Sequence, residues 1–143
     1  MKLNRFTAGI IMTAFIGAGI LVSSQPVHAA SWHSGTPTVL RGKWRTKVLH
    51  ESGTPYTRRG YLSVKSHSFN WHAAFVPDPS FGAHAKYQRL SKGNYIIAGR
   101  NYANVPAGGV VLSYHVRLYN RHKLYFKGLG TEKFWPGHVY YKY

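Results

Sequence analysis

Residues 40–48 read Leu40-Arg41-Gly42-Lys43-Trp44-Arg45-Thr46-Lys47-Val48 and give the clearest alternation in the chain. The even positions are apolar or small, and the odd positions are basic. Because successive side chains of a strand point to opposite faces, we expect Leu40, Trp44 and Val48 to point inward. The four cations Arg41, Lys43, Arg45 and Lys47 would then point outward. The stretch therefore predicts a strand that buries a tryptophan behind a basic row.

The same period of two recurs along the chain, whereas helical periodicity is almost absent. It is clear in residues 68–75 and again in residues 112–118. Shorter segments rich in β-branched and aromatic residues lie at 60–65, 85–90, 95–99, 123–127 and 139–143. The side chains expected to fill the interior are Trp44, Phe69, Trp71, Phe75, Leu112 and Tyr114.

About eight short strands separated by turn-forming residues are typical of a barrel or a sandwich. Ser91-Lys92-Gly93-Asn94 is expected to form a hairpin turn. A closed barrel is favoured over an open sheet because the exposed edges of exported sheets would pair with one another. We therefore predict an all-β fold, a single antiparallel up-and-down β-barrel of about eight strands. The interior of such a barrel either is filled by side chains or holds one small ligand.

The N-terminal segment predicts export. Lys2 and Arg5 precede an apolar run over residues 8–22, and small residues follow near Ala29. This order is typical of a secretory signal peptide, and the run is shorter than the roughly 20 residues that a membrane-spanning helix needs. We predict a signal peptide at residues 1–29, an extended lead-in at 30–38 and one β-barrel domain at 39–143, with no transmembrane segment in the mature protein. The chain has no cysteine, which excludes disulfides, thiol chemistry and cysteine zinc sites.

A resemblance is carried by the opening of the predicted domain, which follows the pattern His33-x-Gly35-Thr36-Pro37-x-x-Leu40-Arg41-Gly42-x-Trp44. This opening resembles that of small secreted proteins of lactic-acid bacteria, which combine a signal peptide with a basic β-rich domain. Gly42-x-Trp44 on a first strand is also similar to the Gly-x-Trp of the lipocalin-like (calycin) barrels. The second resemblance implies a lipocalin-like barrel in which the tryptophan closes one end beneath a basic side chain of the last strand. Lys142 or Arg117 could take that place.

The charge of the chain predicts an anionic partner. Nineteen lysines and arginines face only three acids, Glu51, Asp78 and Glu132, so the formal net charge is +16. Alternate residues of a strand lie about 6.6–6.8 Å apart, so the row Arg41, Lys43, Arg45 and Lys47 would span roughly 20 Å of one face. Such a row could follow a polyanion, or it could simply solvate the outer face and discourage edge pairing. No motif specific for nucleic acids is present.

Catalytic and metal-binding patterns are missing from the sequence. The three acids all fall in predicted connections, and no nucleophile elbow or zinc-protease motif occurs. The eight histidines of the mature chain lack ligand spacing, so no metal and no cofactor is expected. With ordinary pKa values near 6.5 they would gain charge in an acidified medium. We therefore expect affinity for an anionic surface to rise between pH 7 and 5, and we do not expect an enzyme.

These observations lead to one expected function and two alternatives. The expected function is a secreted basic binding protein, associated with the bacterial cell envelope through electrostatic contact with anionic cell-wall polymers or a membrane surface. It would be retained non-covalently at the cell surface or act in the medium. The first alternative is a lipocalin-like carrier with a small apolar ligand in the barrel interior. The second is a secreted cationic antimicrobial protein, although no amphipathic basic helix is visible in the mature chain.

Overall fold

The computed structural model describes residues 30–143, and the predicted signal peptide at 1–29 lies outside the described residues. Eight strands of this part form the barrel: β2 (Gly42–Thr46), β5 (Tyr61–Val64), β6 (Phe69–His72), β7 (Ser80–Ser91), β8 (Asn94–Asn101), β9 (Val110–Asn120), β10 (Lys123–Leu129) and β11 (His138–Lys142). The smaller elements are β1 (His33–Ser34), β3 (Leu49–His50), β4 (Thr57–Arg58) and two 3-10 helices, η1 (Thr38–Leu40) and η2 (Gly130–Glu132). The described residues include no helix long and apolar enough to cross a bilayer.

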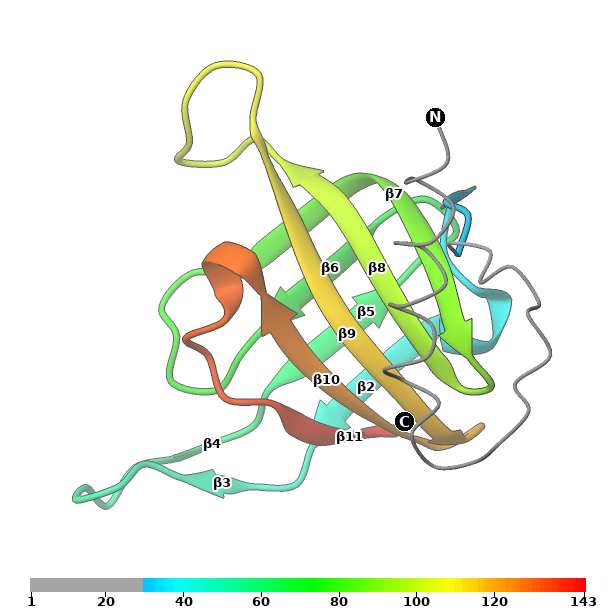
Figure 1. Cartoon of the computed structure of the whole chain (residues 1–143). Coiled ribbons are helices and arrows are strands. Elements are labelled where there is room, and N and C mark those ends of the chain that lie inside the picture. The colour runs from blue at the N-terminus through cyan, green and yellow to red at the C-terminus, as the bar shows by residue number, and fades with distance from the viewer. Residues whose placement is uncertain (1–29) are drawn as a thin grey trace, which may run out of the picture.

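The eight strands follow one another around the barrel in chain order, each antiparallel to the next (Figure 1). The last strand, β11, pairs with the first, β2, through Tyr140 with Thr46 and Lys142 with Trp44. This pairing closes the sheet and confirms the predicted up-and-down barrel. Residues 92 and 93 form the tight turn between β7 and β8, as the hairpin prediction required.

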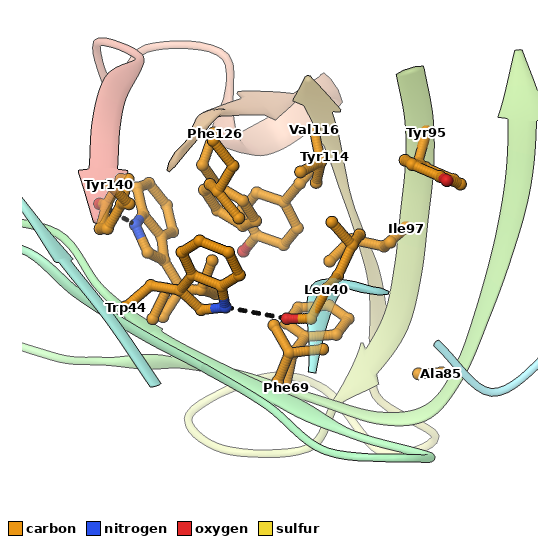
Figure 2. Close-up of a cluster of buried hydrophobic side chains, with 14 of the residues drawn as sticks. Leu40, Trp44, Phe69, Ala85, Tyr95, Ile97, Tyr114, Val116, Phe126 and Tyr140 are labelled. Carbon is orange, nitrogen blue, oxygen red and sulfur yellow. Dashed lines mark hydrogen bonds between the residues drawn. The ribbon is translucent and has the colours of Figure 1, made fainter. Parts of the chain in front are cut away.

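The barrel interior is filled by aromatic side chains (Figure 2). Five of the six predicted interior residues are at most 3% exposed: Trp44, Phe69, Trp71, Leu112 and Tyr114. The ring of Tyr114 stacks on that of Phe126 with 4.8 Å between centroids, and the rings of Phe69 and Trp71 meet Tyr114 edge-on at 5.4 and 5.2 Å. Edge-to-face and offset contacts of this kind add to the stability that burial itself provides.

Two glycines show how closely the interior is packed. A Cβ placed on Gly82 would lie 2.2 Å from Cζ of Phe69, and one on Gly99 would lie 2.7 Å from Cα of Gly82. The absence of both side chains lets β7 and β8 approach the Phe69 ring. Beside Phe69 the interior is therefore occupied by the protein's own side chains.

Two of the predicted inward positions are wrong. Val48 is 46% exposed because β2 ends at Thr46, whose hydroxyl accepts a hydrogen bond from Gly60 N at 2.9 Å, and the chain leaves the barrel for β3. Phe75 is only half-buried and lies outside the core, because β6 ends at His72. The φ of Phe75 is +65°, a left-handed conformation that interrupts the alternation of a strand.

The segment at 30–38 lies against β7 before it enters η1. Residues His33 and Ser34 of β1 pair with Tyr87 and Lys86, and Gly35 N donates a hydrogen bond to Ala85 O at 2.7 Å. Leu40, predicted to begin the first strand, instead ends η1, although its side chain is buried as expected.

The barrel has two ends of different construction (Figure 1). The η1 end consists of η1 and the tight turns at 65–68, 92–93 and 121–122. The η2 end consists of the longer connections at 47–60, 73–79, 102–109 and 130–137, which include the β3–β4 hairpin and η2. These two names are used below.

Candidate functional site

Trp44 and Lys142 close the η1 end of the barrel. The indole is fully buried and donates a hydrogen bond from Nε1 to Leu40 O at 2.8 Å (Figure 2). The Nζ atom of Lys142 lies 5.1 Å from the centroid of the Trp44 ring, a distance at which a cation is attracted by the ring face. Gly42 has a φ of +127°, which favours glycine, and a Cβ there would approach Cε of Lys142 to 2.8 Å, so the lysine would have to shift. Of the two cations that the calycin resemblance suggested, Lys142 is the one that covers the tryptophan.

The predicted basic row is divided by the structure. Lys43 and Arg45 lie on β2 and are exposed on its outer face, and Lys47 is exposed just beyond the end of the strand. Arg41 is half-buried, and its guanidinium donates to Thr36 O at 3.0 Å and to Thr36 Oγ1 at 3.4 Å. Arg41 therefore stabilises the lead-in, and the freely presented cations of the row are the other three.

The exposed cations of β2 lie among aromatic side chains of neighbouring strands. Arg45 lies 4.7 Å from the ring centroid of Tyr143, and Lys47 lies 5.6 Å from that of Tyr141. The ring of Tyr61 meets that of Tyr143 edge-on at 6.4 Å. The outer face is therefore a mixed surface of rings and positive charges.

A hollow of about 270 Å³ lies on this face beside β2. Lys43 and Lys65 are its cations, and Tyr61, Phe81 and Tyr143 provide rings that are between 43% and 55% exposed. No residue that lines it is acidic: the others are Leu62, Ser63, Ser68, Phe69 and Asn70. We call the hollow and the adjoining side chain of Arg45 the outer basic face.

Strand register explains how these side chains come together. Lys43 pairs with Ser63, Ser63 with Asn70, and Asn70 with Phe81, so one row of outward side chains crosses four strands. Neighbouring strands lie about 4.8 Å apart, so Lys43 and Phe81 mark the two sides of a band roughly 14 Å wide. Sequence analysis identified only Lys43 and Arg45 of the outer basic face. The outward positions Tyr61 and Lys65 could have been read from the alternation of residues 60–65. Phe81 lies on β7 and Tyr143 directly follows β11, and the sequence does not reveal which strands these two lie beside.

The three acids all lie at the η2 end. Glu51 is in the connection between β3 and β4, Asp78 is in the connection between β6 and β7, and Glu132 is the last residue of η2. The turns of the η1 end contain no acid and carry Lys65, Lys92 and Arg121. The connections of the η2 end also carry four cations, Lys47, Arg58, Arg59 and Lys133, so four cations against three acids leave them a net charge of +1, whereas the three turns of the η1 end carry +3. An anion at the η1 end would therefore meet the least repulsion from carboxylates.

Two polar side chains with buried oxygen atoms, Tyr114 and Glu132, lie at the η2 end of the interior. Tyr114 Oη and Glu132 Oε2 are both buried without a hydrogen-bond partner. Burial raises the pKa of the Glu132 carboxyl, and burial together with the Glu132 charge raises the pKa of Tyr114. The Ser80 hydroxyl partly offsets both shifts. Among residues 30–143 no cluster of three or more metal-ligating side chains is present.

Comparisons with protein-family models, with curated protein sequences and with solved structures found no match for this chain. Its function is therefore inferred from its surfaces and its charge.

Proposed function

We propose that the protein is a secreted, basic binding protein that attaches to anionic polymers of the bacterial cell envelope through the outer basic face. The observation that carries the proposal is the hollow beside β2, where Lys43 and Lys65 flank three exposed rings and no acid is present. Electrostatic attraction would hold the protein at the cell surface. Where no anionic polymer binds it, the protein would be free in the medium.

Geometry supports an extended ligand. Lys43 and Arg45 point outward from alternate positions of one strand, about 6.7 Å apart along the chain. Lys47 follows the end of that strand and lies beside the ring of Tyr141. A polymer with regularly spaced phosphate or carboxylate groups could contact these cations in succession. The rings of Tyr61, Phe81 and Tyr143 supply apolar area for the uncharged parts of the repeating unit.

The electrostatic contribution to binding comes from several weak contacts between the cations of the outer basic face and one polymer. An exposed ion pair contributes little by itself, typically under about 1 kcal/mol, and is weakened by salt. Several such contacts with one polymer add, and each releases counterions from the polymer. Binding should therefore be tight at low ionic strength and should decline steeply as salt is raised.

A salt-wash fractionation of the producing culture tests the proposal. At low ionic strength the protein should sediment with the cells, and a high-salt wash should release it, because screened charges no longer attract. Protein that stays in the medium at low ionic strength would contradict envelope binding.

Matched charge variants locate the contact. Lys43→Gln/Arg45→Gln removes two charges from the outer basic face, and Lys127→Gln/Lys133→Gln removes two exposed charges elsewhere. In nucleic acids each neutralised phosphate contributes about 0.7–0.9 to the slope of log K against log salt. The first variant should thus lower the slope for purified wall polymer by about 1.5, and the control should lower it less. Equal effects of the two variants would show that only net charge matters.

Single-stranded nucleic acid is an additional ligand to compare in the same assay, because basic grooves with aromatic rings also bind it. Wall polymer should compete with it for the outer basic face. If nucleic acid binds at high salt while wall polymer does not, the envelope is the wrong partner.

A further inference from the structure

A second hollow, of about 670 Å³, lies at the η1 end and is separate from the outer basic face. It lies between η1, the turns at 92–93 and 121–122, and β11. Its size falls within the range of about 300–1,000 Å³ that is usual for small-molecule sites, and the mouth of a barrel is a common place for them. No residue of the outer basic face lines it.

The wall of this hollow combines two kinds of side chain. Val39, Leu118 and Tyr119 provide apolar and aromatic surface, and Val39 and Tyr119 are exposed to solvent. Four cations reach the same space from four different positions in the chain: Arg89, Lys92, Arg121 and Lys142. None of the lining residues is acidic.

Further cations surround the aromatic wall. Arg117 lies 5.3 Å and Lys123 lies 5.4 Å from the ring centroid of Tyr119. The three acids of the chain lie at the opposite end of the barrel, as described above. Like charges gathered in this way repel one another, and an anion in the hollow would relieve that repulsion.

The turns that carry Lys92 and Arg121 are fixed by hydrogen bonds. Leu118 N donates to Gly93 O at 2.7 Å, and the amide of Asn94 donates to Ser91 Oγ at 2.9 Å. Around the second turn, His122 N donates to Asn120 Oδ1 at 2.8 Å and Lys142 N donates to His122 O at 3.0 Å.

Lys142 is held as well, because its side chain lies between Gly42 and the Trp44 ring. With the backbone around these cations already ordered, less conformational entropy is lost on binding.

We propose that the hollow at the η1 end binds a monoester phosphate attached to an apolar chain. A phosphate monoester presents three acceptor oxygens and close to two negative charges at neutral pH, so it can engage more of the four cations than a carboxylate with two oxygens. The apolar chain would lie against Val39, Leu118 and Tyr119. This site does not depend on polymer binding at the outer basic face.

Titration of the full secreted chain with octyl phosphate below its micellar concentration tests the proposal by calorimetry. Saturable one-to-one binding is expected. Inorganic phosphate should bind at least about tenfold more weakly because it lacks the chain, and octyl glucoside should show no saturable binding because it lacks the charge. If inorganic phosphate or octyl glucoside bound as tightly as octyl phosphate, the proposal that the site recognises both the phosphate and the apolar chain would be wrong.

Charge variants place the ligand. Lys92→Gln/Arg121→Gln changes two exposed residues of turns and should lower the affinity for octyl phosphate about tenfold or more, since two charged hydrogen-bond donors are lost. Lys127→Gln/Lys133→Gln removes the same charge elsewhere and should leave the affinity within about twofold. Equal loss in the two variants would overturn the site and leave only general attraction. Circular dichroism of each variant shows that the barrel is retained.

Vesicles distinguish a free amphiphile from a membrane lipid as the source of the phosphate. The protein is sedimented with vesicles of a zwitterionic lipid that contain a monoester phosphate lipid. If the protein sediments with these vesicles and octyl phosphate prevents this, the result supports the site with a lipid headgroup as its ligand. Binding of octyl phosphate without sedimentation supports the site with a free amphiphile. Sedimentation that the Lys92→Gln/Arg121→Gln variant and octyl phosphate both leave unchanged would overturn the assignment.

Discussion

Gly82→Ala is the sharpest test of the conclusion that the barrel interior is filled. The added methyl carbon would lie 2.2, 2.5 and 2.7 Å from three ring atoms of Phe69. The ring has little room to retreat, because Tyr114 meets it edge-on at 5.4 Å between centroids. Gly82 has no left-handed φ, so the substitution introduces a clash without backbone strain.

The expected cost follows from two opposing effects. Inserting a methyl group into a packed core typically costs about 1–3 kcal/mol. Replacing glycine by alanine inside a strand recovers roughly 0.5–1 kcal/mol, because the unfolded chain loses freedom. Since three ring atoms are affected at once, we expect a net loss of about 2 kcal/mol in the free energy of unfolding.

Urea denaturation monitored by tryptophan fluorescence measures this loss, and the melting temperature should fall by on the order of 10 °C for a domain of this size. The matched control is Gly108→Ala, which has a φ of +89° and no atom within 4 Å of the added carbon, so it measures backbone strain alone at about 1 kcal/mol. Phe69→Leu in the Gly82→Ala background should recover about 1 kcal/mol relative to additivity. A Gly82→Ala protein as stable as the parent would refute the reasoning, since Phe69 would then have free space beside it.

Three further predictions concern charged and titrating groups. Lys142→Met removes the cation over the Trp44 ring and should lower the free energy of unfolding by about 1 kcal/mol in urea denaturation. Burial raises the pKa of Tyr140 to about 12, above the value near 10 in the unfolded chain. Its contribution to stability should therefore be complete below pH 10 and lost as the pH rises toward 12, and Tyr140→Phe should remove that part of the alkaline transition. Burial, and for His115 also nearby cations, lowers the pKa values of His115 and His138. Their contribution should be complete above about pH 6.5 and decline on acidification, and His115→Asn/His138→Asn should flatten the decline measured by urea denaturation.

The fold follows from local patterns wherever a strand keeps its alternation. Trp44, Trp71 and Tyr114 are buried because each lies inside a strand, at a position that points to the inner face. Val48 lies two residues past the end of β2 and Phe75 lies three residues past the end of β6, and the alternation alone does not show where pairing stops. Phe75 adopts a left-handed backbone conformation, and an aromatic residue in the sequence does not indicate such a conformation.

The candidate sites were less accessible to sequence reasoning. Arg41 belongs to the basic row by its position, but a hydrogen bond to Thr36 O diverts it into the lead-in. The cations Lys92 and Arg121 lie 29 positions apart in the chain, and only the antiparallel pairing of β8 with β9 brings their turns side by side at one end.

The sequence alone determined the all-β class, the approximate number of strands and the large positive charge, because composition and period two are local properties of the chain. Tertiary structure decided where that charge acts. Closure of the barrel by β11 on β2 set Lys142 over Trp44, and the antiparallel order placed all three acids at the η2 end. Both results depend on which strands are neighbours, a relation between distant residues that is fixed only when the sheet closes.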